Sequence, residues 1–395
     1  MKRPEISEFV CSVCSSLRLS QRKTLSVLVP AAMTLARASL AQLGRALAEQ
    51  CPVAAKHCIK RVDRFVGNVR IEPIEAMRGI VQWLAEPRAK LLVSLDWVDI
   101  RPFHCLVLAA RLRGRALPLL WAVYRHEDVY RSPNNLEYGL LRAFRSMVPA
   151  STSVTILADR GFGRTEMARV CQALAFHYII RIQSTAWIHS RRFTGRLNAY
   201  PIHRGQRHLL RNVRYRKVRP VRQHVAVVWL PAQEEPWYLM TDQDHLKAQA
   251  LSKVFARRMS IEEYFRDTKS KRNGFALRLI QIKDSQRLSR FLLVLALAYL
   301  LLMTVGLYAW QHFQPGQWCS NNRAGECSLL TIGRFMQHRD LPTCNDLLPG
   351  LKHELLKLNW GDSGVMLSGR QGGTSSLRVD LWNAPRSVIS TGGLP

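Results

Sequence analysis

Acidic residues are scarce in this chain. Its 395 residues include 28 Asp and Glu against 58 Lys and Arg, which gives a formal net charge of +30 at pH 7. So large an excess of one sign indicates a polyanionic partner, most simply nucleic acid, and says little about the fold. A chain with so few carboxylates has few to spare, and each one at a distinctive position is therefore a candidate for a specific role.

Cysteine is also sparse, and the motifs of several enzyme classes are missing. Nine Cys are too dilute for a disulfide scaffold, and an odd number is typical of a reducing compartment. No GxxxxGK[ST] loop occurs, so ATP use has no support. The twelve His lack spacings such as HExxH or HxxxH, which predicts surface or phosphate-facing roles. One CxxC, Cys11 and Cys14, has only Cys51 and Cys58 nearby, and is a weak zinc signal.

Only one segment looks membranous. The first residues, MKRPEISEFVCSVC, contain no apolar core of a signal peptide. Residues Phe291–Trp310 carry no charge and are long enough to span a membrane. Because this run is single and directly follows a charged, motif-bearing segment, we predict a helix buried inside a large domain. The alternative is a basic protein anchored in a membrane by this run.

Hydrophobic periodicity predicts two kinds of structure in the first half of the chain. Residues 1–88 have apolar positions at helical spacing. Up to Arg70 they contain twelve Lys/Arg against four acidic residues, which favours a helical DNA-binding domain over an ordinary solvated face. Pro30 is expected to kink or restart a helix there. Residues 89–183 follow the order β-β-β-α-β-α-β, which predicts an α/β fold with a mixed sheet covered by helices.

The second half begins with a strongly basic stretch. Residues 184–245 are predicted to form a β-rich insertion, and twelve Lys/Arg with no acidic residue lie between Arg181 and Arg222. Cations without anions, interleaved with aromatic residues, predict a surface that lies along DNA phosphates, with a merely solvated loop as the alternative. Residues 246–358 are predicted helical, and 359–395 a flexible Gly/Ser-rich tail. The cations proposed for DNA contact are Arg191, Arg192, Arg214, Arg216 and Lys217.

Three carboxylates stand out by position. Asp96 lies inside the apolar strand LLVSLDWV, Asp159 ends the strand VTILAD, and Glu262 lies near a helix start. Oxygen ligands collected from distant segments are typical of a Mg²⁺ site. Taken singly, each also has a structural explanation: a buried carboxylate, a turn ion pair and a surface helix charge. Asp99 rivals Asp96, but three residues further along an extended strand it points to the opposite face.

With these motifs in place, the chain resembles the DDE transposases of bacterial insertion sequences, specifically the insertion-sequence-four group, over roughly residues 60–335. That group has a ribonuclease-H-like fold, with its three acids in the slots of Asp96, Asp159 and Glu262. The run LADRGFG is similar to its second motif. PWYLMT resembles a family strand whose Trp wedges into the DNA end, which makes Trp237 a candidate wedge, with core packing as the equal alternative.

The group's Tyr-x2-Arg-x3-Glu-x6-Lys signature is matched except at its first position. Arg258 and Lys269 have the required spacing from Glu262, which favours Glu262 over Glu263. Phe255 occupies the Tyr position, so a hydroxyl and its phosphate contact are lost. Helical spacing is expected to put Arg258, Glu262, Arg266 and Lys269 on one face.

The resemblance implies a metal-dependent DNA transposase that cuts the terminal inverted repeats of its element and joins them to target DNA. The three carboxylates are expected to bind Mg²⁺, as two ions with Mn²⁺ able to substitute, while Arg258, Arg266 and Lys269 hold the phosphodiester. A homodimer on two DNA ends and a bacterial cytoplasmic, nucleoid-associated location are also implied, and a hairpin intermediate is left open. The alternative is an inactive or repurposed transposase that only binds DNA.

Overall fold

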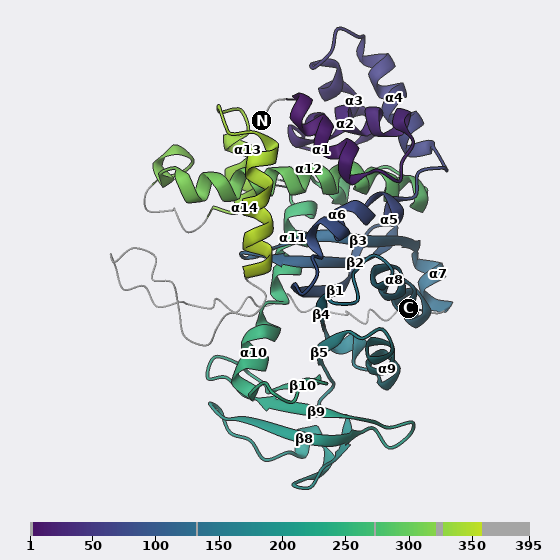
Figure 1. The fold of residues 1–395 in the computed structure, drawn as a ribbon. Coiled ribbons are helices and arrows are strands. Elements are labelled where there is room, and N and C mark those ends of the chain that lie inside the picture. The colour runs from purple at the N-terminus through teal and green to yellow at the C-terminus, as the bar shows by residue number, and fades with distance from the viewer. Residues whose placement is uncertain (1–2, 132, 272–273, 321–326, 358–395) are drawn as a thin grey trace, which may run out of the picture.

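The computed structural model describes residues 3–131, 133–271, 274–320 and 327–357, and its backbone is one ten-stranded sheet with helices packed around it (Figure 1). The strand order is β3-β2-β1-β4-β5-β10-β9-β8-β6-β7. The strands are β1 (Lys90–Ile100), β2 (Phe103–Leu112), β3 (Arg115–Arg125), β4 (Ser153–Ala158), β5 (His177–Arg181), β6 (Trp187–His189), β7 (Thr194–Arg196), β8 (Arg207–Tyr215), β9 (Val221–Val228) and β10 (Trp237–Thr241).

The first five strands form a ribonuclease-H-like sheet, as predicted. β1, β2 and β3 are antiparallel neighbours, and β4 and β5 are added parallel to β1. Both faces of β1 and β4 are largely buried, which explains why their sequences read as continuous apolar runs. In the β1–β4 register Leu95 pairs with Ala158, so the next residues of the two strands, Asp96 and Asp159, are neighbours.

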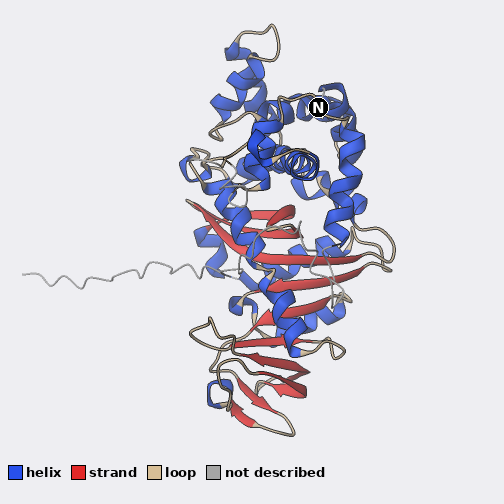
Figure 2. Cartoon of the chain, turned by 90° about the vertical axis from the view of Figure 1, so that its left-hand side faces the viewer, coloured by secondary structure: helices blue, strands red, loops and turns tan. Residues whose placement is uncertain are grey.

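The predicted β-rich insertion does not form a separate sheet. β10 pairs antiparallel with β5, and β9, β8, β6 and β7 continue the same sheet outward. Figure 2 shows the strands as one stack, with most helices gathered around the end opposite the insertion. The basic surface of residues 184–245 is therefore joined by continuous strand pairing, through β10 and β5, to β4, which Asp159 follows, and to β1, which carries Asp96.

Among the described residues six helices precede the sheet: α1 (Arg3–Val13), α2 (Leu19–Met33), α3 (Leu40–Ala48), α4 (Ala55–Gly67), α5 (Pro73–Ala76) and α6 (Arg78–Leu84). Of the two outcomes predicted for Pro30, a restart is wrong, because α2 continues through this residue and ends three residues later; a kink stays a prediction. The chain breaks instead at residues 34–39, before the Ser39 side chain caps α3 by accepting from the Gln42 N–H.

The remaining helices include one that the sequence did not predict, α7. In chain order they are α7 (His126–Arg131), α8 (Pro133–Arg145), α9 (Thr165–Ala173), α10 (Ala248–Ala256), α11 (Met259–Lys269), α12 (Ser285–His312), α13 (Leu329–Met336) and α14 (Cys344–Lys357). The predicted tail, 359–395, lies outside the described residues.

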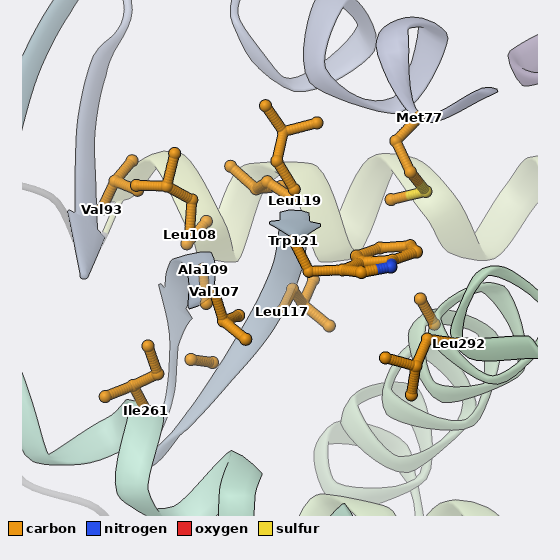
Figure 3. Close-up of a cluster of buried hydrophobic side chains, with 14 of the residues drawn as sticks. Met77, Val93, Val107, Leu108, Ala109, Leu117, Leu119, Trp121, Ile261 and Leu292 are labelled. Atoms are coloured by element: carbon orange, nitrogen blue, oxygen red, sulfur yellow. The ribbon is translucent and has the colours of Figure 1, made fainter. Parts of the chain in front are cut away.

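The long apolar run lies in α12, and α12 is the central helix of the core. Of its most hydrophobic 18-residue window, 94% is buried inside the protein. The Trp121 indole N–H donates to the Ser289 carbonyl and hydroxyl oxygens, which ties β3 to α12. Figure 3 shows Leu292 of α12 and Ile261 of α11 in one buried cluster with Trp121 and the side chains of β2. The hydrophobicity of this helix is therefore explained by packing against the sheet and its neighbouring helices.

Candidate active site

Asp96 lies on β1 and points toward α11. Its side chain is 20% exposed, and its Oδ2 accepts a hydrogen bond of 3.0 Å from a terminal nitrogen of Arg258. Its Oδ1 accepts from the backbone N–H of Trp97 at 2.9 Å. A carboxylate in an apolar strand is costly to ionise unless it is paired, and both of these contacts favour the charged form.

Arg258 connects Asp96 to Glu262. Its second terminal nitrogen donates to Glu262 Oε1 at 2.7 Å, one helical turn further along the chain. The guanidinium is buried, with the Arg258 residue only 7% exposed. One planar cation thus holds two carboxylates that are 166 residues apart in sequence, since 262 − 96 = 166.

Asp159 completes the group from the neighbouring strand. It directly follows β4, and its negative charge is among those that raise the pKa of Asp96. Its Oδ1 is buried and accepts no hydrogen bond from any residue that the structure describes. A buried carboxylate oxygen without a donor is costly, and a bound cation is the simplest partner for it. The donor set therefore fits a hard divalent metal ion.

The three carboxylates repel one another electrostatically. The pKa of Asp96 is raised from its ordinary value of 3.8 to about 6. Burial raises this pKa most, the Arg258 guanidinium and the Trp97 N–H oppose that rise, and the charges of Asp159 and Glu262 add to it. In the absence of a further cation, the arrangement therefore disfavours full ionisation of this site. A metal ion would remove that penalty.

A second polar network, which the sequence did not predict, braces the same edge of the sheet. Glu137 of α8 is 3% exposed; it accepts a 3.0 Å bond from the Trp97 indole N–H and pairs with Arg164. Arg164 also donates to the Gly161 carbonyl at 2.7 Å, inside the loop that follows Asp159. The network thus joins the neighbour of Asp96, the Asp159 loop and α8. No motif marks Glu137, and only its burial in the fold identifies it.

Other charged residues of α11 form ion pairs of their own. Glu263 points away from Asp96, toward Arg115 of β3 at 3.4 Å and Arg266 at 2.9 Å. The role of Arg266 in DNA contact stays a prediction. Lys269, at the end of the helix, is half-buried; burial and Arg278 lower its pKa and the charge of Asp99 raises it. Glu262, and not its neighbour, is the α11 carboxylate that shares a cation with Asp96.

Trp237 is half-buried at the start of β10. Its ring packs edge-on against Phe255, with centroids 5.2 Å apart. The Phe255 ring in turn lies 5.9 Å from the Arg258 guanidinium carbon. Trp237 is therefore linked to the carboxylate group through one aromatic ring, and the described contacts are those of packing. Whether it also wedges DNA stays a prediction.

The five cations predicted to contact DNA lie on or between the outer strands. Arg191 and Arg192 are exposed in the turn between β6 and β7, and Arg214 is exposed on β8. Arg216 and Lys217 help to line a cavity of about 500 Å³ together with Trp187 and Arg164. The Lys217 ammonium lies 5.3 Å from the Trp187 ring centre. The cavity is lined mainly by cationic, polar and aromatic side chains, with Glu166 as its one carboxylate, and Arg164 on its wall is five residues after Asp159.

The cysteines predicted as weak zinc ligands do not gather into one site. Cys51 Sγ lies 3.7 Å from Cys58 Sγ, and Cys14 is buried, with its thiol pKa raised by that burial to about 12. A thiol that resists deprotonation is a poor zinc ligand. In the described part of the chain neither pair belongs to a group of three metal-ligating side chains.

The family model described as "Transposase DDE domain" matches residues 102–301, just over half of the chain. The match includes Asp159, Arg258 and Glu262 but begins six residues after Asp96. No curated protein matches the chain. Proteins with this domain use divalent metal ions for polynucleotidyl transfer, in keeping with the donor set that the fold assembles.

The raised pKa of Asp96 predicts a stability gain when its charge is removed. The pKa is higher in the folded than in the unfolded chain, so folding takes up protons, and stability falls as pH rises from about 3.8 to about 6. A pKa difference of about 2 corresponds to at most ~3 kcal/mol. In magnesium-free buffer at pH 8, Asp96→Asn should therefore raise the free energy of unfolding by ~1–3 kcal/mol, measured by urea denaturation.

The gain should shrink as the pH is lowered toward 4, where wild-type Asp96 is protonated in the folded chain. Asp244, whose side chain is 72% exposed, supplies the control, and Asp244→Asn should change stability by less than ~0.5 kcal/mol. A less stable Asp96→Asn chain at pH 8 would contradict the electrostatic account.

Proposed function

Because the chain belongs to the Transposase DDE domain family, we propose that it is an active DNA transposase that cuts the ends of an insertion sequence and joins them to target DNA. The proposal is supported by the pairing of Asp96 and Glu262 with the buried Arg258, and by Asp159, whose negative charge raises the pKa of Asp96. A protein that only bound DNA would gain nothing from three clustered carboxylates beside phosphates, since they repel the ligand. This favours catalysis over the alternative of a repurposed DNA-binding protein.

Asp96, Asp159 and Glu262 are the residues that would hold Mg²⁺, as two ions, with Mn²⁺ able to replace it. When bound, the ions would activate the attacking water or 3′-hydroxyl and stabilise the leaving oxygen. The carboxylates act as ligands in ionised form and form no covalent intermediate. The unpartnered Oδ1 of Asp159 and the raised pKa of Asp96 support this role.

Arg258 has two roles in this proposal. Without DNA it neutralises Asp96 and Glu262, and its fork geometry also suits a phosphodiester oxygen. Phe255 in the signature's Tyr position offers an aromatic face and no hydroxyl, so the phosphate contact falls to Arg258 and, at the far end of α11, Lys269. The Arg266 side chain, which is 62% exposed and pairs with Glu263, is also proposed to contact DNA.

The DNA path extends from the carboxylates over the basic insertion. The cavity lined by Arg164, Arg216, Lys217 and Trp187 lies beside the Asp159 loop, and Arg191 and Arg192 extend the positive surface to the last strands. We further propose that helices within residues 1–88 bind the terminal repeat, since α4 exposes Lys56, Lys60, Arg61 and Arg64. Units 89–183 and 246–358 then form the catalytic core, and 184–245 the DNA-binding insertion.

The assembly and location follow from the chemistry proposed. Two element ends must be joined to one target, so we propose a homodimer in which each copy holds one terminal inverted repeat. The location proposed is the bacterial cytoplasm, on the nucleoid. The experiment that tests the function is incubation of the purified chain with duplexes carrying candidate element ends and Mg²⁺, with cleavage read on a gel.

Asp159→Asn is the sharpest variant for that assay. It keeps the shape of the side chain and removes the charge of the unpartnered carboxylate, so cleavage should fall at least roughly 100-fold. Binding of the same duplex without metal should stay within about threefold, because no cation that contacts phosphate is lost. Asp244→Asn should cleave like the wild type. Cleavage by Asp159→Asn at the wild-type rate would remove Asp159 from the catalytic group. Binding without cleavage by the wild-type chain would favour the binding-only alternative.

The basic insertion should make DNA binding depend steeply on salt. Each phosphate neutralised contributes a slope of about −0.9 to the logarithm of the binding constant against the logarithm of salt concentration. Replacing the exposed Arg191, Arg192 and Lys217 with Gln should therefore reduce the slope by up to about 2.7. Variants with Lys at 191 and 192 keep the charge and should keep the slope. Equal slopes for the Gln variant and the wild type would exclude these residues from the DNA surface.

Trp237 separates two steps of the reaction if it wedges DNA. Extracting a base from the stack costs a few kcal/mol, and stacking on an aromatic ring recovers about 1–3 kcal/mol per base. Trp237→Ala should then leave first-strand nicking largely unchanged and slow second-strand processing by at least roughly tenfold. Trp237→Phe should restore most of the rate. If Trp237→Ala slows nicking equally and lowers the melting temperature, its contact with Phe255 is its whole role.

A further inference from the structure

A second group of metal-ligating side chains lies at the far end of β1. Asp99 of β1, His104 of β2 and His126 of α7 each offer one ligand atom, and these atoms all lie within 4.8 Å of one another. The His104 Nδ1 is 2.5 Å from Asp99 Oδ1, and the His104 and His126 ring centres are 3.7 Å apart. This group was not predicted from the sequence, because His104 and His126 lie 22 residues apart and share no motif.

The fold sets the three side chains side by side for local reasons. β1 and β2 form a tight antiparallel hairpin in which Asp99 and His104 are direct register partners, so their side chains share one face. α7 begins immediately after β3, whose Tyr124 pairs with His104, which brings His126 over the same face. Adjustments of rotamer alone would bring ligand atoms at this separation to a common ion.

This group is separate from the three carboxylates. Asp96 and Asp99 are three residues apart on an extended strand, roughly 10 Å, and point to opposite faces. Asp96 faces Arg258, whereas Asp99 faces His104 and shares its side of the sheet with Trp97. The chemistry differs too, because two imidazoles and one carboxylate suit a borderline transition metal, whereas an all-carboxylate group suits Mg²⁺.

We propose that Asp99, His104 and His126 form a site for a transition-metal ion of the Zn²⁺ class. Three protein ligands leave a fourth position open, and the partial exposure of Asp99 (54%) and His104 (25%) allows water to occupy it. The Asp99–His104 hydrogen bond alone accounts for two of the three side chains. It does not account for His126, whose ring lies against His104 and whose nitrogens form no hydrogen bond with any residue that the structure describes.

The ion would join three elements near the catalytic edge. It would fasten α7, which leads into α8 and Glu137, to the hairpin that ends β1. The Trp97 ring contacts His104, with centroids 6.3 Å apart, and its indole N–H reaches Glu137. Zinc binding should therefore stiffen the side of the sheet that positions the Asp159 loop through Arg164. The role is structural and independent of whether the chain cleaves DNA.

The test uses the full chain, free of magnesium and DNA, with Zn²⁺ or Co²⁺ as the probe. The wild type should bind one more equivalent of zinc than His126→Gln, and the zinc-dependent rise in melting temperature should be lost in that variant. Affinity at this site should fall by at least roughly 100-fold, since loss of an outer partner of a ligand already costs 10–100-fold. Cobalt should give a visible absorption band in the wild type that His126→Gln and His104→Gln lack.

Two controls make the result decisive. His203→Gln changes an exposed histidine of the insertion and should bind zinc like the wild type. Asp159→Asn alters the carboxylate group and should keep the zinc equivalent, which separates the two sites. Circular dichroism checks that His126→Gln is folded. Should His104→Gln unfold, His126→Gln still decides. Equal zinc content and equal melting behaviour in the wild type, His126→Gln and His203→Gln would overturn the proposal.

Discussion

The guanidinium of Arg258 is the interaction on which the candidate active site depends. It is buried, and it donates separately to Asp96 on the sheet and Glu262 on α11. Two carboxylates close together in a poorly solvated place repel each other strongly, and removal of a buried cationic partner typically costs 3–5 kcal/mol. Arg258 thus permits the group to exist before any metal or DNA is bound. It also fixes the position of α11 against β1, because both of its hydrogen bonds must be satisfied at once.

Other contacts of α11 with the core hold this helix where Arg258 can donate to both Asp96 and Glu262. Asp267, on the same helix, accepts from the Tyr299 hydroxyl of α12 at 2.9 Å and pairs with Arg115 of β3 at 2.8 Å. Burial raises the pKa of Asp267, and the Arg115 charge and the Tyr299 hydroxyl oppose this rise. The long apolar helix α12 therefore supports α11 through the hydrogen bond from the Tyr299 hydroxyl to Asp267.

Much of this arrangement was readable from sequence, for identifiable reasons. The sequence placed Asp96 inside one apolar strand and Asp159 at the end of another, and the observed register of β1 and β4 makes the two residues neighbours. Glu262 was favoured over Glu263 by spacing, and the structure sets Glu262 beside Asp96. Contacts between elements that leave no periodic pattern in the sequence could not be predicted from it. The Glu137–Arg164 pair is of this kind, as is the continuation of the sheet through β10, because strand pairing across a long insertion leaves no local pattern.

The carboxylates of the candidate site lack enough favourable partners, and a metal ion of the kind that the proposed chemistry needs would supply another. Folded proteins normally satisfy their buried polar groups, yet Asp159 Oδ1 has no donor among the described residues, and burial with like charges raises the pKa of Asp96 to about 6. Both features, the unpartnered Asp159 oxygen and the raised pKa of Asp96, have the same cause. Each reflects a shortage of positive charge beside the carboxylates that Arg258 alone does not make up. The surrounding structure removes the freedom to relax them: β1 and β4 are hydrogen-bonded neighbours, and Glu137 and Arg164 hold the loop after Asp159. A metal-binding active site requires carboxylates that are held in place and lack enough positive charge. The bound metal ion then supplies that charge without a change in the geometry of its ligands.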